Sequence, residues 1–503
     1  MGGTGVEKRM EILRDAGTQQ ILKPFQTHGW HTTVSVEDSD GEYLVIEAEK
    51  TGVTRRVALL YSSATSNLVY KKLDTTVDHI FTNGDLYQIE SFAHGIKASV
   101  SPVSEFFPVL IAWNKQLDPV KPGPPIPPRP SKGRIITSEN PLAAIWSRLD
   151  QFASVTLAKK LVKRRAAEKS VELQEDVAAK KAEGVAFSLR NASDYFKGIP
   201  ADSLNKRILT LYYGTMALAF AEMLAAPQGA RDLDEVEGMT KYGHGLYVLP
   251  SSNGDLGGVH VGLLASGFFP RWAAFLGHDI GNYPKDRAKT ASDLDKKPRG
   301  TTTTMRELLG AIPELGDLFL DVFEDTAPSW VTPIYQLSEN TGGMGLGGRK
   351  SQSTYIHLID DSGLISEDQI RVSGWSLAEL TRITPSEHSS DRGFRARVDH
   401  QGKAGWYEVL PVHNSPFRNS PALIIPVIGG FYEFRTISMI TLYALSILVR
   451  YMPSAWRRVE GGDWDKHLSL VKNAAGVFER VLPEHFLESI LHERIWASQP
   501  GHF

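Results

Sequence analysis

One long apolar stretch, Ile208 to Ala226 (ILTLYYGTMALAFAEMLAA), constrains the fold more than any other part of this 503-residue chain. Its length is close to the roughly 20 apolar residues that span a bilayer. However, Glu222 lies inside it, Lys206 and Arg207 precede it, and Pro227 follows it. A helix that is apolar on nearly all sides also occurs at the centre of a large soluble domain. We therefore predict a buried central helix.

Small residues and a second apolar stretch support this prediction. Gly214, Ala217 and Ala221 would let a neighbouring element approach the central helix closely. The second stretch, Thr436 to Val449, is too short to cross a membrane and predicts another core helix. Two apolar helices so far apart in the sequence indicate one large C-terminal domain.

Composition and charge exclude several kinds of site. The chain has no cysteine, which excludes disulfides, thiolate metal sites and cysteine nucleophiles. A formal net charge of -3 gives no overall attraction to nucleic acid or to anionic membranes. The first 17 residues are polar and lack the apolar core of a signal peptide. We expect a soluble cytoplasmic protein with no membrane partner.

A proline-rich segment marks the clearest domain boundary. The sequence DPVKPGPPIPPRPSKG favours extended backbone and is typical of a semi-rigid spacer. We predict an α/β domain at residues 1–116, a linker at 117–139 and a mainly helical domain at 140–503. Alternating residues predict a β-rich insertion at about 330–415 in the second domain.

The first domain shows one helix followed by strand-like runs. We predict a helix over Val6–His28, a short helix near 65–73 and a strand at 79–82. The other predicted strands are His31–Val36, Tyr43–Ala48, Arg55–Tyr61 and Phe106–Trp113.

Four blocks of the second domain resemble the YaaC-like family of bacterial proteins. They are LYYGTMALAFAEML (211–224), GHGL (243–246), MRELLGAIPEL (305–315) and MITLYALSILVRYMPSAW (439–456). The resemblance extends over about residues 140–503 and implies a mostly helical domain. It carries over no catalytic residue, and the β-rich insertion is larger than the family requires.

The first domain resembles the restriction-endonuclease-like (PD-(D/E)XK) fold in its order of helix, strand, acidic turn and two strands. Such nucleases hold a divalent cation on carboxylates and use a lysine beside the attacking water. The resemblance implies catalytic roles for Glu47, Glu49 and Lys50. It implies metal ligands at Asp38, Asp40 and Glu47, with Mg²⁺ or Mn²⁺ as the cofactor.

The spacing of these residues departs from the family pattern. Position 48 is alanine, and Glu47 and Lys50 point to opposite faces of an ideal strand. A bulge would be needed to align them. Two hypotheses follow. The first is a metal-dependent nuclease effector, suited to bacterial defence against mobile DNA and regulated by the YaaC-like domain. The second is a non-catalytic sensor or scaffold whose degenerate nuclease-like domain binds nucleic acid or a protein partner, a second copy included.

Other candidate residues lie in the second domain. His244 stands between two glycines, where it could be a ligand or an acid–base group, or simply end a turn. Arg480 and His485 match the arginine–histidine spacing of HEPN ribonucleases, although Pro483 is expected to interrupt their helix.

Two segments are candidates for phosphate contacts. The charged section 159–181 predicts a solvated helix face or a phosphate-binding one. The glycine-rich segment Thr341–Gly348 could hold phosphate or form a plain loop.

Overall fold

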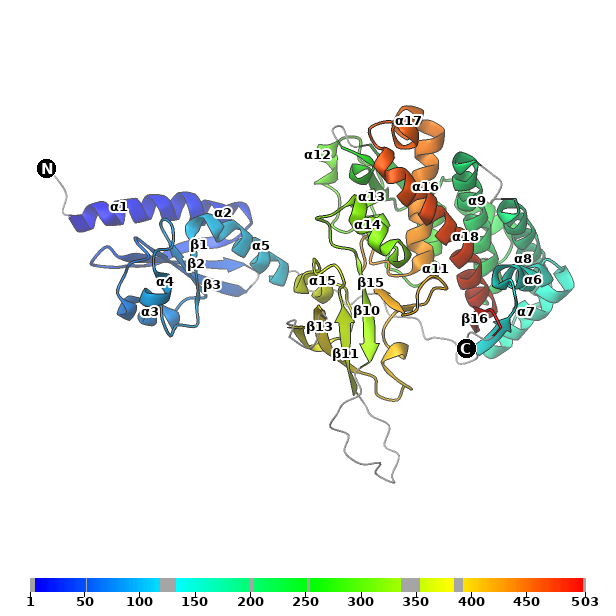
Figure 1. Ribbon diagram of the computed structural model, residues 1–503, viewed down its shortest axis with the longest axis horizontal. Helices are drawn as coiled ribbons and strands as arrows, with labels where there is room; N and C mark the ends of the chain where they lie inside the picture. The colour runs from blue at the N-terminus through cyan, green and yellow to red at the C-terminus, as the bar shows by residue number, and fades with distance from the viewer. Residues whose placement is uncertain are drawn as a thin grey trace, which may run out of the picture. The chain divides into compact units, whose positions relative to one another are not determined.

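The chain forms two compact units, Met1–Lys121 and Pro122–Phe503 (Figure 1). This computed structural model describes residues 5–50, 52–117, 133–198, 203–250, 254–335, 353–383 and 392–500. Most of the predicted linker and the whole glycine-rich segment Thr341–Gly348 therefore lie outside the described residues.

The N-terminal unit is built on a five-stranded sheet with strand order β1-β2-β3-β4-β5. The strands are β1 (His31–Glu37), β2 (Tyr43–Lys50), β3 (Val53–Leu60), β4 (His79–Thr82) and β5 (Ser99–Pro102). The first three strands are antiparallel, while β3, β4 and β5 run parallel. Hairpins join the antiparallel strands, and helices provide the crossovers that parallel strands require.

Helices cover both faces of this sheet (Figure 1). One face is covered by α1 (Gly5–Gly17), a π-helical turn at Thr18–Leu22, α2 (Lys23–Thr27) and α5 (Phe106–Leu117). On this face Leu44, Ile46 and Ala48 of β2 are buried. The other face carries α3 (Asn67–Asp74) and α4 (Ile89–Phe92), over Tyr43 and Val45. The alternation along β2 thus divides its side chains between two cores.

The prediction of a strand at Phe106–Trp113 is wrong, because this segment begins α5. Phe106, Leu110 and Trp113 are all buried, and their spacing of four and three residues fits one helix face. A short apolar run does not distinguish a strand from a buried helix. The fifth strand is instead β5, a partly exposed segment of four residues.

The second unit is organised around α9 (Leu204–Ala225), which contains the apolar stretch. Helix α8 (Glu175–Phe196) packs along it at very short range. A Cβ atom on Gly214 would lie 2.6 Å from the ring of Phe196, and one on Gly184 would lie 2.9 Å from Leu224. The predicted close approach at Gly214 is therefore confirmed.

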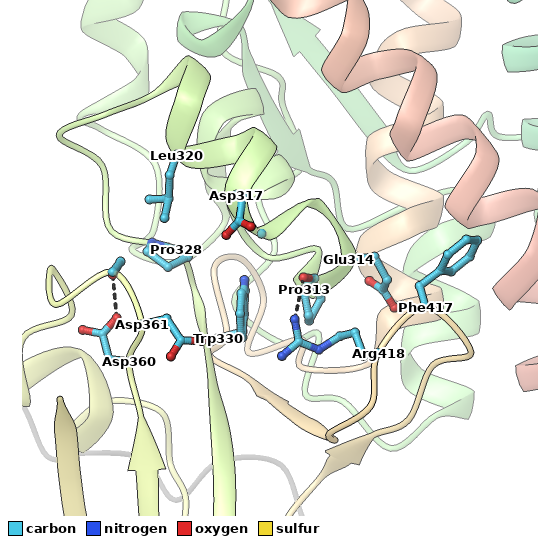
Figure 2. Close-up of a pocket in the computed structure, with 12 residues that line it drawn as sticks. Pro313, Glu314, Asp317, Leu320, Pro328, Trp330, Asp360, Asp361, Phe417 and Arg418 are labelled. Atoms are coloured by element: carbon cyan, nitrogen blue, oxygen red, sulfur yellow. Dashed lines mark hydrogen bonds between the residues drawn. The ribbon is translucent and has the colours of Figure 1, made fainter. Parts of the chain in front are cut away.

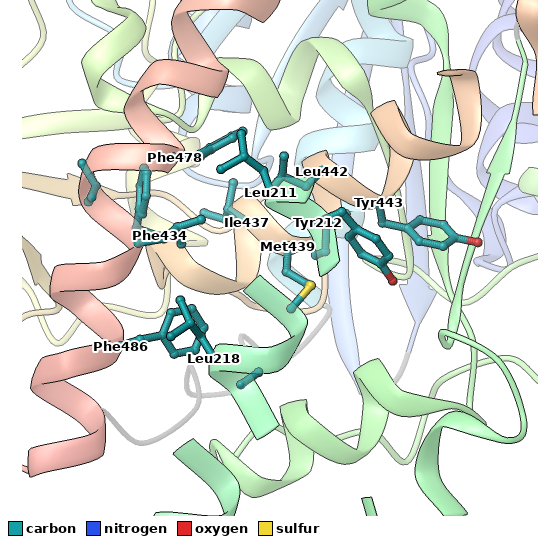
Figure 3. Close-up of a cluster of buried hydrophobic side chains, with 14 of the residues drawn as sticks. Leu211, Tyr212, Leu218, Phe434, Ile437, Met439, Leu442, Tyr443, Phe478 and Phe486 are labelled. Atoms are coloured by element: carbon teal, nitrogen blue, oxygen red, sulfur yellow. The ribbon is translucent and has the colours of Figure 1, made fainter. Parts of the chain in front are cut away.

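Two later helices complete the core around α9. These are α16 (Phe434–Tyr451) and α18 (Leu468–Leu491). Figure 3 shows Leu218 of α9 close to Phe486 of α18, and Leu211 beside Ile437 of α16. Among the described residues, α9 is the single helix that is by itself long and apolar enough to cross a membrane, and most of it is buried. Helices α16 and α17 pass the same test only as a pair bent by 105°.

Lys181 of α8 satisfies the carbonyl groups where α9 ends. Its Nζ donates to the carbonyl oxygens of Ala226 at 3.0 Å and Ala230 at 2.6 Å, with longer bonds to Leu224 and Gly229. The side chain is almost completely buried, and this burial lowers the pKa of Lys181 to about 8. The last carbonyls of a helix have no partner within the helix, so this lysine takes the place of a cap.

The described part of the second unit has nine further helices, of which α15 packs in a separate core with the large sheet. They are α6 (Pro141–Gln151), α7 (Val155–Glu168), α10 (Leu233–Thr240), α11 (Phe268–Phe275), α12 (Ala291–Leu294), α13 (Met305–Gly310), α14 (Gly316–Val322), α15 (Glu367–Arg371) and α17 (Pro453–Gly461). Pro313 begins a 3-10 turn between α13 and α14.

The described residues of the second unit form three sheets. The largest is antiparallel, in the order β12-β13-β11-β10-β15-β14. Its strands are β10 (Trp330–Tyr335), β11 (Ser353–Ile359), β12 (Ala378–Ile383), β13 (Gly393–Asp399), β14 (Val412–His413) and β15 (Ala422–Ile424). The second sheet pairs β7 (Leu246–Leu249), β8 (His260–Leu263) and β9 (Thr302–Thr304). The third pairs β6 (Gly133–Thr137) with β16 (Arg494–Ser498) in parallel.

Candidate functional site

Strand β2 places Glu47 and Lys50 on opposite faces of the N-terminal sheet. Pairing between β2 and β3 runs without a shift from Tyr43 to Lys50, so the bulge that would align them is absent from this strand. The carboxylate of Glu47 pairs with Arg56 at 2.7 Å. Lys50 Nζ donates to the carbonyl oxygen of His28 at 2.8 Å and to Asn114 Oδ1 at 3.0 Å. The structure does not bring this acid and this lysine together.

The acidic turn before β2 lies far from Glu47. The side chain of Asp38 accepts hydrogen bonds from the backbone N–H groups of Asp40 and Glu42 and thereby shapes the hairpin. The Asp38 N–H donates to the carbonyl of Tyr43, four residues before Glu47. At about 3.3 Å per strand residue, that separation is roughly 13 Å, too long for shared coordination of one metal ion.

Glu49 is exposed at the far end of the same strand. Within the part of the chain that the structure describes, no group of three or more His, Asp or Glu side chains is placed to hold a metal ion. The residues predicted for Mg²⁺ or Mn²⁺ are therefore dispersed along one hairpin.

His244 lies in a loop whose backbone requires both flanking glycines. Gly243 and Gly245 have φ angles of +91° and +77°, which L side chains rarely adopt. A Cβ atom on Gly245 would also lie 2.2 Å from Pro270. The backbone N–H of Phe269 donates to the carbonyl of His244 at 2.9 Å, which ties the loop to the start of α11.

The imidazole of His244 contacts two tyrosines from different core helices. Its Nδ1 lies 2.7 Å from the phenol oxygen of Tyr212 on α9. Its ring centre lies 5.6 Å from that of Tyr443 on α16. Figure 3 shows the phenol groups of Tyr212 and Tyr443 next to each other, pointing the same way. The Tyr443 hydroxyl donates to the carbonyl of Leu246 at 2.8 Å.

Arg450 completes this group of side chains with a positive charge. Its guanidinium donates to the Tyr213 hydroxyl at 2.7 Å and to the carbonyl and hydroxyl oxygens of Ser446, each at 3.2 Å. All these acceptors are neutral. Burial, and secondarily the charge of Arg450, lowers the pKa of His244. We call Tyr212, Tyr213, His244, Tyr443 and Arg450 the His244 cluster.

A neutral imidazole beside an unneutralised guanidinium suits the binding of an anion and the transfer of a proton. The cluster unites three sequence blocks that are separated by up to about 240 residues. From the sequence, His244 is a candidate site residue, and Arg450, which ends the second apolar stretch, could pair with a buried acid or line a pocket for an anion. The tyrosines were hidden because Tyr212 and Tyr443 belong to helices that are otherwise core.

Residues 150–490 match the family model of the YaaC-like protein. The chain belongs to the YaaC-like family. No curated protein and no solved structure matches the chain. The matched range contains the whole His244 cluster, whereas the N-terminal unit lies outside it. The cluster is therefore part of the YaaC-like region itself.

Arg480 and His485 of the YaaC-like region serve separate contacts. Helix α18 continues through Pro483, so the expected interruption is wrong; the buried packing of this turn outweighs the one hydrogen bond that proline cannot donate. Five residues correspond to about 140° around a helix, so the two side chains do not share a face. Arg480 pairs with Glu484 at 2.7 Å, and His485 Nε2 bonds the carbonyl of Asn414 at 3.1 Å.

A pocket of about 220 Å³ lies where the large sheet of the YaaC-like region meets η5 (Pro313–Leu315) and α14 (Figure 2). Arg418 stacks on Trp330 at 4.2 Å and donates to the carbonyl of Pro313 at 3.0 Å. Glu314 pairs with His413 at 2.7 Å. These contacts hold the sheet to the helical core, and His485 packs against His413 at the same junction.

Glu222, the one acidic residue in the apolar stretch, is the centre of a buried network. It accepts hydrogen bonds from Arg435, from Ser489 and, at 2.9 Å, from Trp272 Nε1. Arg435, just before the second apolar stretch, is thus paired with Glu222 of the first. The network joins α9, α11, α16 and α18, and its role is structural.

Three basic side chains of the charged section in α7 form ion pairs. Lys159 and Lys163 both pair with Glu175, at 2.7 and 2.6 Å. Arg164 pairs with Glu493 at 3.2 Å. These ion pairs favour a solvated helix face over a phosphate-binding one.

Proposed function

We propose that the chain is a non-catalytic sensor or scaffold, in which the N-terminal unit recruits a protein partner and the YaaC-like domain regulates it. In this proposal the N-terminal unit has a restriction-endonuclease-like fold that has lost its metal site. Its order of helix, three antiparallel strands, helix and parallel strand supports that fold. The cysteine-free composition supports action in the cytoplasm.

The observation that carries this proposal is the geometry of β2. A metal-dependent nuclease needs its carboxylates and lysine around one cation and one water. Glu47 and Lys50 instead occupy opposite faces, and each has a hydrogen-bonding partner on its own face. Realigning them would require breaking both sets of contacts and shifting the register of a central strand.

The charge of the N-terminal unit favours a protein over nucleic acid. Residues 1–117 contain 11 Lys and Arg against 14 Asp and Glu. Phosphate contacts from basic side chains supply most non-specific affinity for nucleic acid. Arg14, Arg55 and Arg56 of this unit are paired with Glu37, Asp78 and Glu47. A second copy of the chain is one such protein partner.

The test is a cleavage assay with the full-length protein. Plasmid, linear and single-stranded DNA and RNA are incubated with Mg²⁺ or Mn²⁺, beside Lys50→Ala and Glu47→Ala. We expect no metal-dependent cleavage by any of the three proteins. Cleavage by the wild type that both variants lack would overturn the proposal and establish the nuclease effector, the form suited to defence against mobile DNA. Equal cleavage by all three would place a nuclease site elsewhere and would also overturn it.

A further inference from the structure

A groove between α8, α9 and α10 has the size of a small-molecule site. Its volume is about 360 Å³, within the range of roughly 300 to 1,000 Å³ typical of ligand pockets. The groove lies in the YaaC-like region, and its use as a site does not depend on whether the N-terminal unit cleaves nucleic acid.

Four aromatic side chains form the walls of this groove. Phe187 and Tyr195 come from α8, and Tyr213 and Phe220 from α9. Phe187 is 50% exposed and Tyr195 38% exposed, which is unusual for such large rings on a core helix. The rings of Tyr195 and Tyr213 are stacked, with centres 5.9 Å apart. Exposed aromatic faces of this kind bind planar rings by stacking.

A positive charge lies at the Tyr213 side of the groove. The guanidinium carbon of Arg450 is 5.7 Å from the centre of the Tyr213 ring. Arg450 makes three hydrogen bonds to neutral oxygens, so two of its five N–H groups remain for another acceptor. In the described part of the chain no carboxylate forms a salt bridge with it. The charge is available to an anionic group attached to a ring that stacks on Tyr213.

Two polar side chains complete the lining. The hydroxyl of Ser188 is buried and has no hydrogen-bond partner among the described residues. Leaving a buried polar group unsatisfied is unfavourable, and a ligand in the groove would supply the partner. Glu237 of α10 offers an exposed carboxylate that can accept hydrogen bonds from a hydroxyl or an amino group.

We propose that this groove, together with Arg450, binds a mononucleotide. The base would stack among Tyr213, Phe187 and Phe220, with Ser188 as a hydrogen-bond partner. The phosphate would contact Arg450, and Glu237 would accept from a ribose hydroxyl or an exocyclic amine. Each requirement of this ligand class has a matching residue: the aromatic rings and Glu237 on the groove for a planar ring and hydrogen-bond donors, and Arg450 beside the groove for an anionic group.

Isothermal titration of the full-length protein tests the proposal. The probes are AMP, GMP, CMP and UMP, with the corresponding nucleosides and inorganic phosphate. We expect at least one nucleotide to bind with 1:1 stoichiometry and more tightly than its nucleoside or phosphate. Phe187→Ala should weaken binding about tenfold, while Phe107→Ala, an equally exposed ring in the other unit, should leave it unchanged.

Variants of Arg450 test the anionic part separately. Arg450→Gln should weaken binding of the nucleotide but not of the nucleoside, and Arg450→Lys should restore part of the affinity. Thermal unfolding shows whether each variant is folded. If Arg450→Gln does not fold, the affinity of Phe187→Ala alone tests the proposal. The absence of binding by all four nucleotides would overturn the proposal. So would inorganic phosphate or a nucleoside that binds as tightly as the nucleotide, or full affinity in Phe187→Ala.

Discussion

The phenol oxygen of Tyr212 lies 2.7 Å from Nδ1 of His244, so the central helix α9 directly holds the loop between Gly243 and Gly245. Tyr212 is buried, and burial raises its pKa. The phenol therefore stays protonated, and the pair is a neutral hydrogen bond inside the core.

Tyr212→Phe should remove this hydrogen bond while keeping the ring. We expect the free energy of unfolding to fall by about 1 kcal/mol, the usual contribution of one buried hydrogen bond. Chemical denaturation measures this change. Tyr451→Phe, in an exposed ring on α16, is the matched control and should be neutral. A Tyr212→Phe protein as stable as the wild type would show that the bond does not hold the loop.

Lys50→Met and Glu47→Gln should differ in stability, and not in cleavage. Lys50→Met leaves the carbonyl oxygen of His28 without its lysine donor and removes one of two donors to Asn114 Oδ1, which keeps Trp30, and we expect a loss of about 1–3 kcal/mol. Glu47→Gln weakens a half-exposed ion pair with Arg56, so its cost should stay below about 1 kcal/mol. Thermal unfolding of the full-length variants, followed through the transition of the N-terminal unit, compares the two losses of stability. Equal losses would contradict a buried structural role for Lys50 and a weak surface pair for Glu47.

His485→Asn should change how stability depends on pH. Burial, and then His413, lowers the pKa of His485 to about 3. Between pH 6.5 and 3 the unfolded state takes up a proton that the folded state does not, so stability is lost as the pH falls through this window. Relative to His485→Asn, the wild type should lose about 2 kcal/mol between pH 7 and 5. Chemical unfolding of both proteins measures this. The same difference in free energy of unfolding between wild type and His485→Asn at pH 7 and at pH 5 would refute the prediction.

Lys181→Met should reveal a pH dependence of the same sign in an alkaline window. The pKa of Lys181 is lowered to about 8 by burial, from 10.5. Between pH 8 and 10.5 the unfolded state binds more protons than the folded state, so stability from this group rises with pH. The stability difference between wild type and Lys181→Met should therefore increase by about 3 kcal/mol from pH 8 to 10.5. Urea titrations at several pH values measure the free energy of unfolding of both proteins. A difference between them that does not change with pH would contradict the burial of the Lys181 charge.

Glu222→Gln should be the most destabilising of these changes. It removes the shortest ion pair of the buried Arg435 guanidinium and leaves Glu433, at 3.9 Å, as its remaining salt-bridge partner among the described residues. Breaking a buried ion pair costs about 3–5 kcal/mol. Asp463→Asn, which breaks the exposed pair with Arg458, should have little effect. A mild Glu222→Gln phenotype would indicate that the buried charge is compensated elsewhere.

The sequence was most informative where one physical requirement dominates. A nearly uniform apolar stretch predicted a core helix, and its single carboxylate, Glu222, is paired with Arg435 inside that core. Alternation predicted β1, β2 and β3 to within a few residues. The strict side-chain alternation of β2 also indicated that Glu47 and Lys50 would point apart.

Other features depend on contacts that no local pattern encodes. Lys181 ends a charged section of 23 residues, and nothing near it in the sequence shows that its amine meets carbonyls of α9 and the following loop. The His244 cluster joins Tyr212 to residues 32 and more than 200 positions away. Pro483 is tolerated inside α18 because packing on both sides of that turn compensates for the missing hydrogen bond.

The parallel pairing of β6 with β16 has a consequence for biosynthesis. Arg494 lies opposite Gly133, so β6, at the start of the second unit, pairs with a strand that is synthesised some 360 residues later. The N-terminal unit can fold while the ribosome is still translating, since all its strands precede residue 103. The pairing of β6 in the second unit can form only after β16 emerges, and until then the backbone N–H and C=O groups of β6 lack this partner strand.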